Sequence, residues 1–250
     1  MKKRRLGQPL KKETLENLIG AVLNQVFFSD DGRDKKLYYD YQPGNSKLLI
    51  VTGENATGKS LFAQIFQQYC GRFVKRVRCV RDGLDIRTGP FASLRCGLID
   101  NMSTGDVGVE QVLAMLEKRN KEDPLRLQDG ETPYRGVYFV FDEPGLGLSE
   151  NYQCTMGVYI GRYVKKMDPR VYGVVVVSHS RYLVNHLLEE GGFSLGKGGR
   201  RPHHVRFGDK MRLKTWLETE PKPAQIDDLI SLRYRGITMM RKIATMRKRK

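Results

Sequence analysis

The chain alternates between continuous apolar runs and segments in which apolar residues recur every three or four positions. Residues 48–51, 137–141 and 174–177 are apolar throughout, which is typical of strands buried on both faces of a parallel sheet. Apolar residues at helical spacing follow these runs, so helices are expected to connect the strands. The pattern therefore predicts an α/β fold in which a mainly parallel sheet is flanked by helices.

Local patterns predict the remaining elements. Apolar residues on one side predict a helix over 13–24, and alternating apolar and basic residues predict a half-exposed strand over 73–80. A short aromatic strand is expected over 37–41, with further helices over 150–167 and 181–188.

The turn after the first apolar run carries a phosphate-binding pattern, GxxxxGK[ST]. It is formed by Gly53, Glu54, Asn55, Ala56, Thr57, Gly58, Lys59 and Ser60. Glycines let the backbone wrap an anion with its N–H groups, Lys59 can reach nucleotide phosphates, and the Ser60 hydroxyl can bind Mg²⁺. The next helix adds its N-terminal charge and has one apolar stripe, Phe62, Ile65, Phe66 and Tyr69. A chance turn is the alternative, but the flanking strand and helix are the context that the motif requires.

Two acidic residues end the second apolar run. Asp142 and Glu143 stand at the carboxyl end of an expected buried strand, where open α/β sheets place their ligands. Asp142 can hold Mg²⁺, and Glu143 can orient or deprotonate an attacking water. His179 ends the third run and is expected in the same crevice. The alternatives are a structural acid pair and a plain loop histidine.

A second candidate anion site lies in residues 101–106. Ser103, Gly105 and other small polar residues precede apolar residues at helical spacing, which predicts a helix N-terminus able to accept an anion. A capped helix without a ligand is the alternative. The polar residues 118–135 that follow are expected to form a surface loop.

Basic residues are concentrated at both ends of the 250-residue chain, whose formal net charge is +16. Residues 2–5 and 241–250 carry these clusters, which attract polyanions through counterion release. A nucleic acid is therefore a candidate partner. Solubilising tails are the alternative, and residues 2–5 also resemble a nuclear address.

Other features argue against a membrane protein and a metal-binding cysteine cluster. No run approaches the roughly 20 apolar residues of a membrane span, and no signal-peptide pattern is present, so a cytoplasmic location is expected. The four cysteines form no CxxC pair, and reduced thiols are expected. His203 and His204 have no companion cysteines and are expected in a surface loop rather than as metal ligands.

The order of these motifs resembles that of the ABC-type ATPases, including their soluble branch with SMC and recombination-repair proteins. The segments GENATGKS, VYFVFDEP, GLGLSE and VVVVSHS resemble the Walker A motif, the Walker B motif, the D-loop and the switch-histidine strand. MSTGD at 102–106 resembles a degenerate LSGGQ signature. The resemblance covers about residues 37–207, in which 193–207 would form the strand pair that ends such a domain.

This resemblance implies a P-loop NTPase fold that binds ATP and Mg²⁺. Lys59 and Ser60 would bind phosphate and Mg²⁺, and Asp142 would hold the metal. Glu143 would be the general base, and His179 would contact the γ-phosphate. Ser103 and Gly105 would contact the γ-phosphate of a nucleotide on a second protomer, in a head-to-tail dimer that closes on ATP. The residue stacking on adenine would be Tyr38, Tyr39 or Tyr41.

Three departures from the family pattern stand out. No glutamine occurs between Gln68 and Gln111, so the Q-loop has no clear counterpart. Lys59 and Ser103 lie too close in sequence for the usual helical subdomain or a long coiled coil. Asp106 replaces the signature glutamine and Ser149 the usual D-loop aspartate. The missing Q-loop glutamine and the short spacing argue against a transporter subunit, whereas the replacements at Asp106 and Ser149 concern the contacts across the dimer.

The sequence favours a soluble ATPase that acts as an ATP-driven dimer switch, with a nucleic acid or a nucleic-acid-processing protein as its partner and a phage or defence setting as one possibility. Its parts would be a basic arm and helix over 1–36, the ATPase domain over 37–207 and a basic helical tail over 208–250. One alternative is a P-loop kinase of a small molecule or nucleotide. Another is a nucleotide-gated interaction module with negligible turnover.

Overall fold

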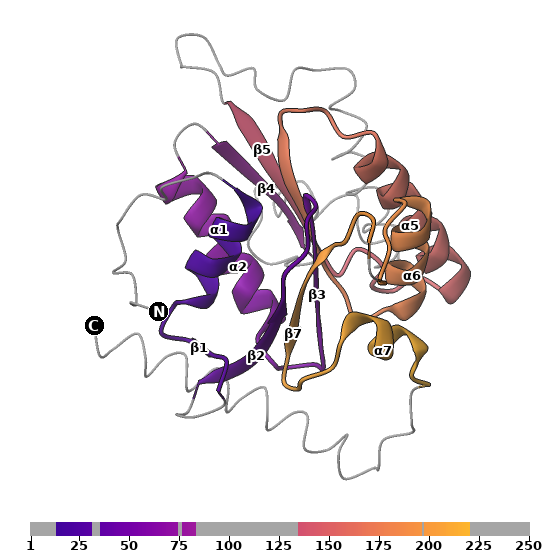
Figure 1. Ribbon diagram of the computed structural model, residues 1–250, viewed down its shortest axis with the longest axis horizontal. Helices are drawn as coiled ribbons and strands as arrows, with labels where there is room; N and C mark the ends of the chain where they lie inside the picture. The colour runs from indigo at the N-terminus through magenta and orange to yellow at the C-terminus, as the bar shows by residue number, and fades with distance from the viewer. Residues whose placement is uncertain (1–13, 32–35, 75–76, 84–134, 197, 221–250) are drawn as a thin grey trace, which may run out of the picture.

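A seven-stranded sheet lies between two layers of helices (Figure 1). The computed structural model describes residues 14–31, 36–74, 77–83, 135–196 and 198–220. One face of the sheet is covered by α1 (Leu15–Leu23) and α2 (Lys59–Phe73). The other face is covered by α5 (Glu150–Lys165), α6 (Arg181–Glu190) and α7 (Leu213–Glu218). The predicted α/β class with helices on the sheet is confirmed.

The sheet is mostly parallel, and its strand order is β1-β2-β7-β3-β6-β5-β4. The five strands from β7 to β4 run parallel to one another, whereas β2 runs antiparallel to β7. Carboxyl ends of parallel neighbours meet at one edge, so the residues after β3, β5 and β6 come together there. The strands are β1 (Phe28–Ser29), β2 (Leu37–Gln42), β3 (Leu48–Gly53), β4 (Val77–Gly83), β5 (Gly136–Asp142), β6 (Val171–Val177) and β7 (His203–Phe207).

The continuous apolar runs are the most buried part of the sheet. Every residue of β3 and β5 is buried, and in β6 every residue except Tyr172 is buried. Each of these strands has a neighbour on both sides and helices on both faces, so no position along it faces water. The predicted buried strands are confirmed.

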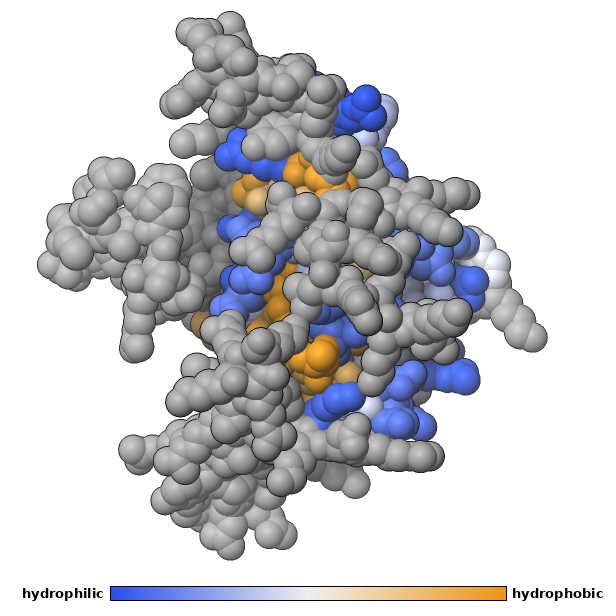
Figure 2. All heavy atoms as spheres, turned by 90° about the vertical axis from the view of Figure 1, so that its left-hand side faces the viewer, coloured by the Kyte–Doolittle hydropathy of each residue, from blue (hydrophilic) through white to orange (hydrophobic). Residues whose placement is uncertain are grey.

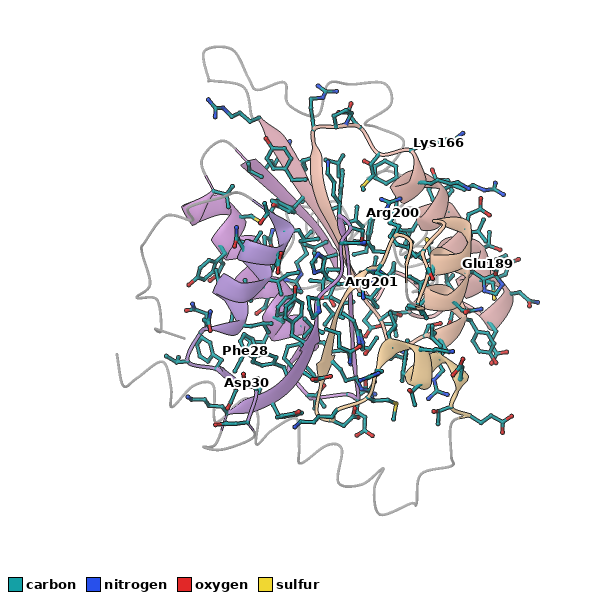
Figure 3. The ribbon with its side chains drawn as sticks, in the orientation of Figure 1. Phe28, Asp30, Lys166, Glu189, Arg200 and Arg201 are labelled. Carbon is teal, nitrogen blue, oxygen red and sulfur yellow. The ribbon has the colours of Figure 1, made fainter. Side chains whose placement is uncertain are left out.

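The two faces of the sheet form two separate apolar cores. The α1 and α2 side contains the predicted stripe of α2, in which Phe62, Ile65, Phe66 and Tyr69 are all buried. The other side packs α5, α6 and α7 against the alternate residues of the same strands. Side chains fill both spaces between sheet and helices (Figure 3). On the described part of the α1 and α2 side, hydrophilic side chains surround smaller hydrophobic areas (Figure 2).

Several predicted boundaries differ from the structure. Phe73 belongs to α2, and the half-exposed strand starts later, at Val77. The described residues of this segment before β7, 193–196 and 198–202, contain no strand, so β7 is the part of the expected strand pair that they show. Phe193 instead packs against the core beneath α5 and α6. Short apolar pieces separated by glycines do not distinguish a strand from a packed loop.

The prediction that His203 and His204 lie in a surface loop is wrong. Both lie in β7, which pairs with β2 and β3, and both side chains are buried. The Tyr41 hydroxyl is 2.8 Å from His203 Nδ1, and the Thr52 hydroxyl is 2.8 Å from His204 Nε2. These hydrogen bonds replace water for the imidazole rings, a compensation that hydropathy along the sequence does not reveal.

Other predicted segments lie outside the described residues. These are the basic arm, the 101–106 segment with Ser103 and Gly105, most of the loop expected over 118–135, and the basic tail from 221 onward. No helix in the described part of the chain is long and apolar enough to span a bilayer.

At Gly157 the backbone of α5 lies close to that of α6. A Cβ atom at this position would lie 2.2 Å from the Leu183 carbonyl oxygen, a backbone atom that moves only if α6 moves. We expect Gly157→Ala to lower the unfolding free energy by about 1–3 kcal/mol, as overpacking does.

Gly20→Ala is the control. Its new Cβ meets nothing within 4 Å, and the better helix propensity of alanine should stabilise the protein by roughly 0.5–1 kcal/mol. Urea unfolding measures both. A stable Gly157→Ala variant would contradict the close packing of these helices.

The buried His204 should make the fold sensitive to acid. Burial lowers the pKa of His204 to about 3, and the Arg206 charge adds to the effect. His204 therefore takes up a proton below about pH 6.5 in the unfolded chain, but only below about pH 3 in the folded chain. We expect the contribution of His204 to the unfolding free energy to be complete above about pH 6.5. Between about pH 6.5 and 3 the unfolding free energy should fall by up to about 1.4 kcal/mol per pH unit as the pH is lowered.

Substitution separates this contribution from the rest of the pH dependence. His204→Gln should flatten the loss of unfolding free energy between pH 6.5 and 4, even if it lowers stability at pH 7. His186→Gln, on the surface of α6, is the matched control and should keep the wild-type slope. Equal slopes for wild type and His204→Gln would show that His204 is not held neutral.

Candidate functional site

The turn between β3 and α2 adopts backbone angles that suit glycine. Gly53 and Gly58 have φ values of +146° and +117°, and Ala56 has a φ of 60°. A Cβ on Gly53 would lie 2.6 Å from the Phe207 carbonyl oxygen, so this position also requires close backbone approach. Gly58 precedes α2 and offers no side-chain cap to the N–H groups of the first turn. A helix start of this kind can accept an anion.

Lys59 is buried under this turn. Its ammonium donates hydrogen bonds to the carbonyl oxygens of Gly53 at 2.8 Å and Glu54 at 2.9 Å. The Nζ atom is also 4.0 Å from Glu143 Oε1, which brings the first and second sequence motifs together. Burial lowers the pKa of Lys59, and the nearby Glu143 and Asp142 carboxylates oppose that shift.

Glu143 is held in a strained conformation next to His179. Its φ is 57°, in the left-handed region that a non-glycine residue rarely adopts, and such strain concentrates at functional sites. Its backbone N–H donates to the Val177 carbonyl at 2.9 Å, which joins the ends of β5 and β6. The carboxylate accepts hydrogen bonds from His179 Nδ1 at 2.8 Å and from the His179 backbone N–H at 3.3 Å. The hydrogen bond to Glu143 raises the pKa of His179.

Asp142 makes a buried ion pair with Arg81 of β4. Arg81 Nη2 lies 2.5 Å from Asp142 Oδ2, and only 13% and 7% of the two side chains is exposed. Burial raises the pKa of Asp142, and the hydrogen bond and charge of Arg81 oppose that effect. Asp142 Oδ1 and Arg81 Nε have no hydrogen-bond partner within the described ranges. The pair therefore leaves both a buried acceptor and a buried donor unused.

The residues after Glu143 are tied to the start of α6. Gln153 of α5 donates to the Leu148 carbonyl at 2.7 Å and accepts from the Ser180 hydroxyl at 2.5 Å. The Ser180 hydroxyl also accepts from the Leu183 N–H at 3.1 Å and so caps α6. The turn after the acidic pair and the loop carrying His179 are thus held together by one side chain.

The residue types at this edge fit a magnesium nucleotide. Magnesium in nucleotide sites is held by one or two carboxylates together with phosphates and water, so Asp142 with the Ser60 hydroxyl is a sufficient protein ligand set. The unpartnered Asp142 Oδ1 is a buried acceptor that a cation would satisfy. Among the described residues, no group of three or more His, Cys, Asp or Glu side chains is arranged to hold a metal ion by itself.

The aromatic candidates for stacking on adenine are placed differently. Tyr39 and Tyr41 pack with Leu37 against the core on the α1 and α2 side. The Tyr41 ring is also stacked on His203, with ring centroids 6.1 Å apart. Successive strand residues point to opposite faces, so Tyr38 points away from that core. Tyr38 is the candidate that remains.

Most of the residues that meet at this edge were predicted from the sequence, but Arg81 was not among them. The structure brings Lys59, Glu143 and His179 together and places Asp142 beside them, while Ser103 and Gly105 lie outside the described residues. Arg81 follows directly after the segment 73–80 for which the alternating pattern predicted a strand, and β4 extends beyond it to Gly83. The signal that could have found it is its place near the carboxyl end of a parallel strand, the same argument that selected Asp142.

Comparison with known proteins adds no family assignment. The sequence matches no known protein-family model and no curated protein at a significant level.

The buried Arg81–Asp142 pair should couple strongly in stability. Removing one partner leaves the other charge buried, so Arg81→Gln and Asp142→Asn are each expected to cost about 3–5 kcal/mol of unfolding free energy. The double variant should be more stable than the sum of the two losses predicts, and a double-mutant cycle measures the difference.

An exposed pair provides the control for this cycle. Arg170 and Asp168 lie 2.9 Å apart on the surface, where both side chains are 44% exposed. Arg170→Gln should change the unfolding free energy by about 1 kcal/mol or less. Additive losses for Arg81→Gln and Asp142→Asn would contradict the buried pair.

Proposed function

We propose that the protein binds ATP with Mg²⁺ and hydrolyses it to ADP and phosphate. The observation that carries the proposal is the convergence of Lys59, Glu143 and His179 at the carboxyl edge of the sheet. The three residues belong to segments far apart in sequence, and the strained backbone of Glu143 directs its carboxylate to this point. A cation, an acceptor carboxylate and a histidine around a glycine-bearing turn suit phosphoryl transfer.

Each residue then has a defined role. The Lys59 ammonium exchanges its carbonyl partners for phosphate oxygens, and the N–H groups at the start of α2 bind the same anion. Asp142 and Ser60 would hold Mg²⁺, which neutralises phosphate charge. Glu143 accepts a proton from the water whose oxygen bonds to the γ-phosphorus, and the β–γ bridging oxygen leaves with ADP. His179 orients the Glu143 carboxylate and donates toward the γ-phosphate.

The proposed activity extends to assembly. In the soluble ABC-type ATPases that the motifs resemble, a second protomer completes a site of this type. In this chain, Ser103 and Gly105 would be the residues that the second protomer contributes. ATP would then favour a dimer, and hydrolysis would release it. The net charge of +16 supports a nucleic acid as the partner of such a switch.

Glu143→Gln tests this proposal, because it removes the base and keeps the size of the side chain. We expect the variant to bind ATP, to lose turnover by about 10²- to 10⁴-fold and to form a dimer with ATP. Phosphate release measures turnover, equilibrium binding measures affinity, and size-exclusion chromatography measures assembly.

Glu189→Gln is the control, because Glu189 is exposed on α6, and Figure 3 shows it on the outer helical layer. This variant should keep wild-type turnover. A Glu143→Gln variant with unchanged phosphate release would overturn the assignment of the base. A Glu143→Gln variant that binds ATP and stays monomeric would overturn the dimer.

A further inference from the structure

Arg81 is a charged residue at this edge to which none of the roles above applies. It lies on β4, two residues before the strand ends, and opposes Val140 in the register with β5. Its guanidinium reaches diagonally along β5 to the carboxylate of Asp142. Arg81 therefore reaches the same carboxylate to which Mg²⁺ is assigned.

The hydrogen bonds of Arg81 are incomplete. A guanidinium has five N–H donors in a planar fork, and Asp142 Oδ2 accepts from Nη2. Nε has no hydrogen-bond partner among the residues that the structure describes, and only 13% of the side chain is exposed to solvent. Buried donors are normally satisfied, and planar guanidinium forks match the oxygens of phosphates. The unused donor lacks an acceptor that an oxyanion ligand could supply.

A cation shared with Asp142 would bring such a ligand close to Arg81. Oxygen ligands of Mg²⁺ lie at about 2.0–2.1 Å from the ion, so any two of them are within roughly 4 Å of each other. A phosphate oxygen sharing the cation with Asp142 would thus lie close to the Asp142 carboxylate. Arg81 Nη2 already lies 2.5 Å from that carboxylate. A small rotation of the arginine side chain would transfer its hydrogen bond from Asp142 to the phosphate.

We propose that Arg81 is a phosphate-binding residue of this site, which neutralises Asp142 before the nucleotide binds and contacts a nucleotide phosphate afterwards. This inference rests on the proposed ATP site. It assigns the nucleotide a second protein cation beside Lys59, supplied by the edge strand β4. Without nucleotide, the carboxylates and the cationic side chains of the site neutralise one another. With nucleotide bound, Lys59 and Arg81 both contact the phosphates.

Equilibrium binding of a fluorescent ATP analogue, N-methylanthraniloyl-ATP, at saturating Mg²⁺ tests the assignment without relying on turnover. Arg81→Gln should weaken binding by about 10- to 100-fold, the usual effect of losing a charge-assisted hydrogen bond. Arg81→Lys keeps the charge without the fork and should weaken binding less, by roughly threefold to tenfold. Arg78→Gln is the control, because Arg78 is exposed on the same strand and should bind as the wild type does.

The opposite result would show that Arg81 acts only as the ion-pair partner of Asp142. If Arg81 only neutralises Asp142, its removal frees that carboxylate for Mg²⁺, and Arg81→Gln would bind the analogue as tightly as the wild type or more tightly. That outcome overturns the assignment and leaves the ATP site intact. If Arg81→Gln does not fold, Arg81→Lys decides, and wild-type affinity would overturn the assignment. A wild-type protein that binds no analogue would overturn the proposed function itself.

Discussion

The structure depends on three parallel strands that end at the same edge of the sheet. β6 lies between β3 and β5, so the residues that follow these strands are forced into one small region. The strands themselves are almost wholly apolar and covered on both faces, so polar groups are confined to their ends. One packing requirement, the burial of the strands, therefore also brings Lys59, Glu143 and His179 together.

The charges gathered at this edge must compensate one another. Lys59 is held by two carbonyls and lies near Glu143, Glu143 accepts from His179, and Asp142 pairs with Arg81. A buried charge without a partner is costly, so these contacts allow the site to exist without a ligand. The same groups suit a magnesium nucleotide, because its phosphate oxygens would accept hydrogen bonds from the cationic side chains and its metal would be bound by carboxylate oxygens.

The strands and site residues that could be predicted are those that follow from short, contiguous stretches of sequence. Strands such as β3 follow from uninterrupted apolar runs, and Lys59, Asp142 and Glu143 follow from motifs whose neighbours are adjacent in sequence. His203 and His204 were mistaken because their burial depends on partners in β2 and β3, far away in the chain. Arg81 was missed for the same reason, since its role depends on the pairing of β4 with β5. Pairing between distant segments sets these environments, and composition does not encode it.

The proposed function depends on ATP binding by the β3–α2 turn and its lysine. Isothermal titration calorimetry of the wild-type protein with ATP and Mg²⁺, repeated with Lys59→Ala, measures this binding without relying on turnover. We expect saturable one-site binding by the wild type and a loss of at least tenfold in affinity for Lys59→Ala, because a charge-assisted contact to phosphate is removed. Absence of binding by the wild type, or equal affinity of the two proteins, would contradict it.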